Sequence, residues 1–277
     1  DEIGSGSDSP FDNPDLHDYL ILAEGDSWFT IAGIPTSNLL YSMRFKKMTM
    51  IVNCGFPGDT IKHMSDIVSN QTFKETLSSD GLSWDLLFLS GGGNDLIDNA
   101  NNILLKKGER QGLTINQASD YCKQDVLNDL MAEIQHGYRE IVSLRDSAES
   151  PAIGKPVITH TYDYATARNS PSRFFSVPLL GPWLFKALTE AEIPDEAWVE
   201  ITDYLIDQLA EAIIELDTGT GTNPLDNFHV IDTRDTLTRA KTGTTGQSGD
   251  WLNEIHPDFE GYKKIAKLMD TKAMEFL

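Results

Sequence analysis

Cysteine, basic residues and long apolar runs are all scarce in this chain of 277 residues. The two cysteines, Cys54 and Cys122, form no Cys-x-x-Cys metal motif, and the sequence leaves open whether they pair as a disulfide. Lys and Arg number 22 against 43 Asp and Glu, so the net charge is -21. Because nucleic acid and anionic membrane surfaces would be repelled by this charge, we expect neither as a partner.

Membrane-spanning and targeting patterns are also missing from the sequence. No run approaches the ~18 apolar residues of a membrane span. No basic stretch followed by an apolar stretch, as in a signal peptide, stands at the start. Since a signal peptide is removed on secretion, a cytoplasmic and a secreted location both stay open, as does the oligomeric state.

Apolar stretches alternate with helical patterns along the chain. Strands that are apolar on both faces and separated by helices are typical of a parallel sheet covered on both sides. We therefore predict an α/β fold, with a leader at 1–13 and a single domain at 14–277. The expected strands are 19–23, 48–53, 85–90, 155–160 and 228–232, and the expected helices include 60–68, 114–147, 194–216 and 258–276.

Two further stretches have uncertain roles. Residues 165–194 are long for a connection in a compact domain, so they form either an excursion over the core or an apolar flap near a site. Residues 160–164, His-Thr-Tyr-Asp-Tyr, follow the fourth strand. They are expected to line a pocket at the sheet edge or to form a structural hydrogen-bond cluster.

Polar residues suited to ester hydrolysis follow the strands of the predicted sheet. In such sheets, ligands gather beyond the carboxyl ends of the strands. Ser27 follows the first strand as a candidate nucleophile, and His256 precedes the last helix as the base that would take its proton. The N–H groups of Ser27 and Gly58 and the side-chain amide of Asn94 are candidate oxyanion donors. Taken singly, Gly58 and Asn94 also suit ordinary turns, and His256 a helix entry.

Four short blocks stand in this order: Gly25-Asp26-Ser27, Gly58-Asp59-Thr60, Gly92-Gly93-Asn94-Asp95 and His256-Pro257. With these blocks the chain resembles the SGNH hydrolases, also called GDSL-type esterases and lipases, over residues 20–270. The resemblance implies a flavodoxin-like three-layer α/β/α sandwich with a five-stranded parallel sheet. It also implies Ser27 as nucleophile, Gly58 and Asn94 as oxyanion donors and His256 as base, with no cofactor and no metal.

One position departs from the pattern of that family. An aspartate usually stands three residues before the histidine, whereas this chain has Asn253. An amide oxygen can fix the tautomer of His256 but cannot stabilise the imidazolium by charge. Three interpretations stay open: Asn253 is the orienting residue, Asp250 or Glu254 supplies a carboxylate, or the site is weakened. We favour Asn253, with Asp250 as the next choice.

Several functions compete at this stage. The leading one is a serine carboxylic-ester hydrolase acting on a small-molecule ester, with a carbohydrate O-acetylesterase as the alternative. The apolar residues 177–188 favour an acyl chain weakly. A metal-dependent phosphoesterase would use Asp26, Asn94, Asp95 and His256 as ligands, and a ligand-binding relative would have lost catalysis at Asn253. An α/β-hydrolase elbow and a phosphate-binding loop both lack their motifs here.

Overall fold

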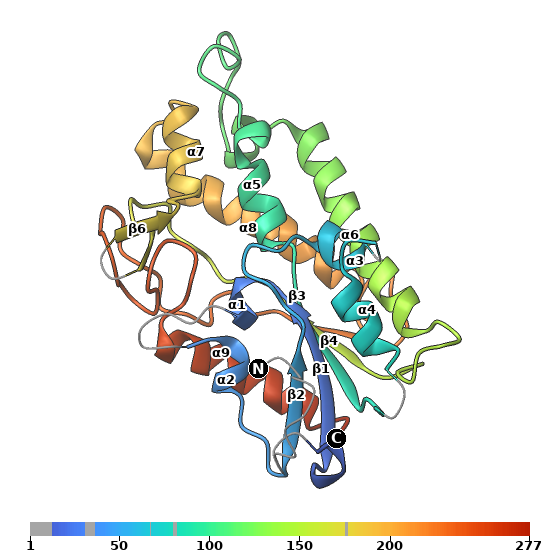
Figure 1. Cartoon of the computed structure of the whole chain (residues 1–277). Coiled ribbons are helices and arrows are strands. Elements are labelled where there is room, and N and C mark those ends of the chain that lie inside the picture. Colours follow the sequence, from blue (N-terminus) through green and yellow to red (C-terminus); the bar gives the residue numbers. More distant parts are fainter. Residues whose placement is uncertain (1–12, 31–36, 67, 80–81, 175–176) are drawn as a thin grey trace.

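A sheet of five parallel strands forms the centre of the molecule (Figure 1). The computed structural model describes residues 13–30, 37–66, 68–79, 82–174 and 177–277. The predicted parallel sheet is confirmed, and each strand begins or ends within two residues of its expected limits. The strands are β1 (Tyr19–Gly25), β2 (Thr49–Asn53), β3 (Leu86–Ser90), β4 (Val157–His160) and β7 (Phe228–Ile231).

The strand order fixes where a ligand can bind. The order is β2-β1-β3-β4-β7, with every neighbouring pair parallel. This is the flavodoxin-like order, in which the direction of winding reverses between β1 and β3 and opens a crevice at their carboxyl ends. Ser27 follows β1 and Asn94 follows β3, so both lie beside that crevice.

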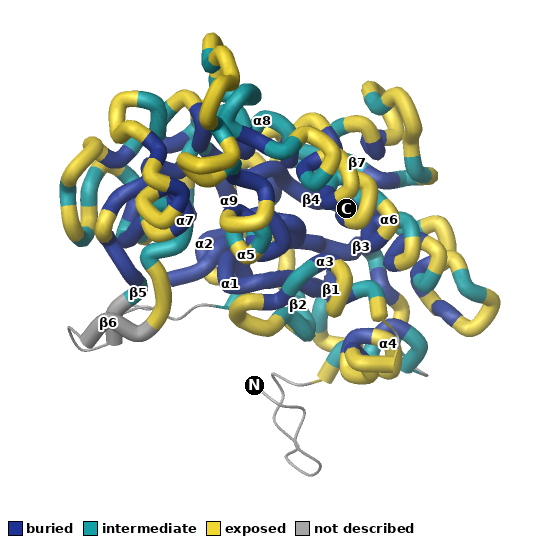
Figure 2. The backbone as a smooth tube through the Cα atoms, turned by 90° about the horizontal axis from the view of Figure 1, so that it is seen from above, coloured by how far each residue is buried: buried dark blue, intermediate teal, exposed yellow. Residues whose placement is uncertain are grey.

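Helices cover both faces of the sheet (Figure 1). The central strands β1, β3 and β4 are buried throughout, the edge strands β2 and β7 are mostly half-buried, and exposed residues lie on the outer surfaces of the helices and in the loops (Figure 2). The predicted sandwich of helix, sheet and helix layers is therefore confirmed. One layer holds α3 (Ile61–Ser65), α4 (Gln71–Leu77), α5 (Gly93–Ile103), α6 (Gln124–Arg145) and α8 (Trp198–Ile214), and the other holds α2 (Leu39–Ser42) and α9 (Phe259–Ala273).

Two helical predictions need correction, and one helix was not predicted. The helix expected at 60–68 begins after its cap Thr60 but ends at Ser65, because the side chain of Asp66 accepts the Val68 N–H and competes with the helix. The helix expected at 114–147 is a 3-10 turn, Ala118–Tyr121, followed by α6. Helix α5 was not predicted, because its apolar residues at helical spacing, Leu96, Ala100 and Ile103, form only a short pattern in a polar sequence.

The long segment 165–194 has structure of its own. Two short antiparallel strands, β5 (Ser172–Phe174) and β6 (Val177–Leu180), are followed by α7 (Leu184–Glu190), which packs against α5. The segment thus lies over the same end of the sheet as Asn94. As for the predicted leader, residues 1–12 are outside the described part, and Asn13 caps the 3-10 helix Pro14–Leu16. The division at residue 13 and the single domain stay predictions.

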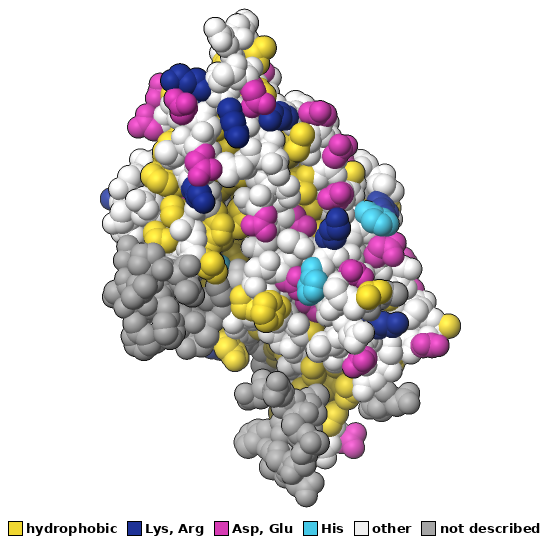
Figure 3. All heavy atoms as spheres, turned by 45° about the horizontal axis from the view of Figure 1, so that its top comes forward, with side chains coloured by type: hydrophobic (Ala, Val, Ile, Leu, Met, Phe, Trp, Pro, Cys, Tyr) yellow, Lys and Arg dark blue, Asp and Glu magenta, His cyan; other side chains and the backbone are white. Residues whose placement is uncertain are grey.

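Charged side chains are distributed over the surface. On the face shown in Figure 3, acidic side chains are interspersed with lysine and arginine and do not form one continuous patch. Among the described residues, no helix is both long enough and apolar enough to span a membrane.

Candidate active site

The turn after β1 holds Ser27 in a fixed position. Asp26 caps the short helix α1 (Ser27–Thr30), because its Oδ1 accepts the Trp28 N–H at 2.9 Å. Gly25 is required just before the turn, since a Cβ there would lie 2.8 Å from a ring carbon of Phe29 and 2.9 Å from the Cβ of Ser90. Ser27 therefore occupies the first position of α1, where backbone N–H groups have no partner within the helix.

His256 lies directly against Ser27. Its Nε2 is 2.8 Å from the Ser27 Oγ, and both residues are buried. Trp28 holds the two elements together, since its indole N–H donates to the carbonyl of Ile255 at 3.2 Å. The hydroxyl and the imidazole, which are 229 positions apart in the sequence, are thus placed for proton transfer.

Asn253 lies against the other nitrogen of the His256 ring. Its Oδ1 accepts the backbone N–H groups of Ile255 and His256 at 3.1 and 2.9 Å, which fixes the amide with its oxygen facing the ring. The same oxygen lies 3.0 Å from Nδ1 of His256. Nδ1 therefore carries the hydrogen, and Nε2 is left as the acceptor for the Ser27 hydroxyl.

The two carboxylates considered as alternatives have other partners. Asp250 pairs with Lys264 and accepts the Thr238 N–H. Glu254 accepts backbone N–H groups from residues 168, 183 and 185. Within the described residues, no carboxylate is hydrogen-bonded to His256. Burial in this uncharged setting lowers the pKa of His256 to about 4.

The candidate oxyanion donors lie on two linked elements. Asn94, at the start of α5, donates from Nδ2 to the carbonyl of Asp59 at 2.8 Å. Asp95 adds a second link, because its Oδ2 accepts the Ile61 N–H at 2.9 Å. Gly58 lies in the exposed loop before Asp59 with φ +84, a conformation that favours glycine. The loop carrying Gly58 is therefore tied to the helix carrying Asn94.

A buried polar network supports the turn from below, and the sequence indicated only part of it. Asp26 accepts hydroxyl groups from Ser90 at 3.0 Å and from Tyr162 at 2.5 Å. Ser90 also contacts Nε2 of His160 at 3.0 Å. Burial raises the pKa of Asp26 to about 6. Its three donors, the hydroxyl groups of Tyr162 and Ser90 and the N–H of Trp28, act against that rise. Residues 160–164 thus combine the two expected roles, since Tyr162 and Asp163 also line the adjacent pocket.

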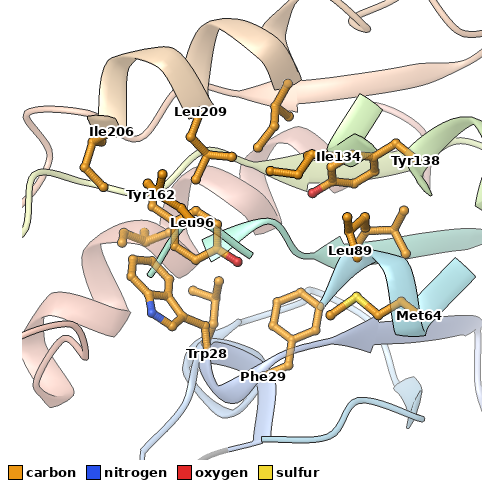
Figure 4. Packing of buried hydrophobic residues seen from close by; sticks show 14 of the residues in the cluster. Trp28, Phe29, Met64, Leu89, Leu96, Ile134, Tyr138, Tyr162, Ile206 and Leu209 are labelled. Atoms are coloured by element: carbon orange, nitrogen blue, oxygen red, sulfur yellow. The ribbon is translucent and has the colours of Figure 1, made fainter. Parts of the chain in front are cut away.

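A small apolar pocket opens beside Ser27 and Asn94. Its volume is about 40 Å³. Figure 4 shows Trp28, Leu96, Tyr162, Ile206 and Leu209 grouped between α1 and α8. The sequence pointed to Tyr162 and Leu184, in the stretches 160–164 and 177–188, but not to the wall residues on α5 and α8, because helical periodicity does not distinguish pocket residues from core residues. The apolar lining comes from α1, α5, α7 and α8, from the segment after β4 and from the loop before α9: Trp28, Leu96, Ile97, Ala165, Leu184, Ile206, Leu209, Trp251 and Ile255.

Comparison with known proteins identifies the family. The sequence model described as GDSL-like Lipase/Acylhydrolase matches residues 25–269, nearly the whole chain. The chain belongs to this family. Its members are carboxylic-ester hydrolases of the esterase and lipase type, so the enzyme class predicted from the four blocks is confirmed. A search of curated protein sequences finds no match.

Solved structures of lipases share the fold. A lipase from a goat rumen metagenome, Lip_vut3, is 13% identical with a TM-score of 0.55, and the alignment covers 93% of this chain and 98% of that one. An extracellular lipase from Streptomyces rimosus is 14% identical with a TM-score of 0.52, covering 92% and 99%. At this identity the likeness establishes the fold alone.

The arrangement around Ser27 does not resemble a metal centre. Asp26 and Asp95, two of the ligands considered for a phosphoesterase, are occupied by hydroxyl and backbone N–H groups. Among the residues that the structure describes, no three histidine, cysteine, aspartate or glutamate side chains are grouped as a metal site.

Proposed function

We propose that this GDSL-family hydrolase cleaves carboxylic esters through an acyl–serine intermediate on Ser27. The observation that carries the proposal is the 2.8 Å contact between the Ser27 hydroxyl and Nε2 of His256, with Asn253 behind the ring. His256 takes the hydroxyl proton as Oγ attacks the ester carbonyl. The same proton then goes to the departing alcohol as the acyl–oxygen bond breaks.

Deacylation uses the same groups in reverse. Water donates a proton to His256 and attacks the acyl carbon, and the carboxylic acid leaves as Oγ of Ser27 regains its proton. In both halves the carbonyl oxygen becomes an oxyanion. The donors that we assign to it are the N–H groups of Ser27 and Gly58 and the amide of Asn94, whose loss individually typically costs roughly 2.7–4 kcal/mol of transition-state stabilisation.

The adjoining pocket favours short acyl groups. A single water molecule needs roughly 10–15 Å³ of pocket volume, and a methyl or methylene group is of similar size. The pocket volume of about 40 Å³ therefore accommodates about three such groups. Acetyl to butyryl esters fit this limit, and acetylated carbohydrates stay a second candidate because their acyl group is equally small. A long lipid acyl chain would need the wall to move.

The decisive experiment is a panel of p-nitrophenyl esters from acetate to palmitate, together with acetylated xylan. We expect turnover to be highest for chains of two to four carbons and to vanish in Ser27→Ala. Covalent labelling by a fluorophosphonate should depend on Ser27 in the same way. Equal activity of Ser27→Ala and wild type would refute the proposal.

A further inference from the structure

Glu254 is a buried carboxylate in the loop that carries His256, and it faces away from the histidine. Its Oε1 accepts the Phe185 N–H at 2.7 Å and the Arg168 N–H at 3.2 Å. Its Oε2 accepts the Trp183 N–H. The backbone N–H of Glu254 in turn donates to the carbonyl of Ser170 at 2.9 Å. One side chain therefore joins this loop to the start of α7.

The residues that Glu254 holds contact both the catalytic histidine candidate and the apolar pocket. The ring of Trp183 meets the ring of His256 edge to face, with centroids 5.8 Å apart. Leu184, the next residue, is buried and forms part of the apolar pocket wall. The same carboxylate thus fixes a contact of the histidine and a wall of the pocket.

A carboxylate suits this position better than any neutral side chain. Its partners are all N–H donors, and its two oxygens, when ionised, can accept every one of them. Burial raises the pKa of Glu254 to about 7, and the backbone N–H donors act against that rise. The nearby guanidinium of Arg168 forms no ion pair with it, and instead donates to the backbone carbonyls of Asn253 and Gly246. Glutamine would place an NH₂ group against a backbone N–H, so at least one donor would lose its acceptor.

We infer that Glu254 is a positioning residue that sets acyl-chain selectivity by fastening the start of α7, and with it Leu184, to the His256 loop. The inference rests on the proposed function, since it concerns selectivity at the same site. Freed from Glu254, the start of α7 can move outward, and the pocket then admits longer acyl groups. The histidine loses the neighbouring Trp183 ring at the same time.

The test compares Glu254→Gln with Asp217→Asn. Asp217 is a matched control, because it also accepts backbone N–H groups, from Gly219, Thr220 and Val230, but lies at the junction of α8 and β7. In Glu254→Gln, we expect the ratio of kcat/KM for hexanoate over acetate to rise about tenfold, as a pocket contact of this size allows. In Asp217→Asn this ratio should stay at the wild-type value, even where stability falls.

A double variant distinguishes the proposed effect of Glu254 on the pocket wall from a general loosening of the protein. Leu184→Ala should raise the same ratio, and combining it with Glu254→Gln should add little, because both act through one wall. Fully additive effects, or an unchanged ratio in Glu254→Gln, would overturn the inference. Should Glu254→Gln fail to fold, Glu254→Asp replaces it, because it keeps the charge but shortens the reach. An unchanged ratio in Glu254→Asp, or full additivity with Leu184→Ala, would then overturn the inference.

Hydrogen exchange provides a readout that needs no turnover. The amides of Trp183 and Phe185 should exchange at least tenfold faster in Glu254→Gln than in wild type, and at the wild-type rate in Asp217→Asn. Unchanged exchange at both amides would show that Glu254 does not hold them. If wild type cleaved no ester in the panel, the proposed function would fail. The exchange rates would still show whether Glu254 holds the amides of Trp183 and Phe185.

Discussion

Oδ1 of Asn253 lies 3.0 Å from Nδ1 of His256 and is held there by two backbone N–H groups. We propose that the amide takes the orienting task that the sequence pattern of the family gives to an aspartate, without its charge. With only neutral groups around the ring, burial lowers the pKa of His256 to about 4. A base with so low a pKa stays unprotonated, and thus active, well into the acid range.

Asn253→Asp tests this relationship through the pH profile. A carboxylate can accept the same three N–H groups, and its charge favours the protonated ring, so the pKa of His256 should rise. The active form is the neutral imidazole, so the acid limb of kcat/KM should move from about pH 4 to higher pH. Above that limb, we expect a rate gain of about tenfold, equivalent to about 1.4 kcal/mol.

Asp250→Asn is the control for that profile. Its carboxylate pairs with Lys264, so the acid limb and the turnover should match wild type within about twofold. If Asp250→Asn moved the acid limb and Asn253→Asp did not, Asp250 would be the orienting residue after all.

Asn94→Ala tests the assigned oxyanion donor. We expect kcat to fall by about 10²–10³ with little change in KM, because the amide acts on charge that develops in the transition state. Asn99→Ala is the matched control. Asn99 stands on the same helix and also donates to a backbone carbonyl, that of Asp95, at 2.9 Å. A loss of equal size in both variants would point to damage to α5 and not to a missing donor.

Leu209→Ala tests the pocket wall. Both Leu209 and Leu205 are buried on α8, but only Leu209 lines the pocket. Each truncation should lower the free energy of unfolding by roughly 2–5 kcal/mol. Only Leu209→Ala should shift the preferred chain length in the ester panel upward. The same shift in Leu205→Ala would mean that general loosening, and not the wall, sets the preference.

Glu24 makes stability depend on pH. It is fully buried on β1, with Asn70 and Gly25 as donors, and burial raises its pKa to about 8. Between its unfolded pKa and pH 8, the native state binds the extra proton, so the free energy of unfolding must fall as pH rises. The lowered pKa values of His160 and His256 act in the opposite direction only below about pH 6.5.

Glu24→Gln should therefore flatten the dependence on pH. Urea unfolding between pH 6.5 and 8 should show a slope smaller by up to about 1.4 kcal/mol per pH unit than in wild type. Glu140→Gln, on the exposed face of α6, controls for the change in net charge. Parallel curves for Glu24→Gln and wild type would mean that Glu24 is ionised in the native protein.

The sequence predicted the sheet well and the shorter helices poorly. Strands such as Leu86–Ser90 are apolar throughout, and a buried strand cannot form without such a run. Helix α5 begins with Gly-Asn-Asp and carries only a short apolar pattern, Leu96, Ala100 and Ile103, so packing against α6, α7 and α8 stabilises it. The ends of α3 depended on the side chains of Thr60 and Asp66, which a period does not reveal.

The same contrast holds for the site. Ser27, Asn94 and His256 stand in recognisable blocks, so their meeting at one sheet edge could be anticipated. The role of Glu254 could not, because its partners are backbone N–H groups and leave no mark on the sequence. The choice between Asn253 and Asp250 also required the structure, since both stand within six residues of the histidine.

Three residues of the pocket wall stand apart in the chain from the reacting groups. Ile97, Ile206 and Leu209 lie on α5 and α8, whereas Ser27 begins α1 and His256 lies in the loop before α9. A library randomised at the three helical positions would therefore explore new substrates while most of its members kept an intact catalytic centre. The fold offers a route to altered selectivity by directed evolution that leaves the chemical step in place.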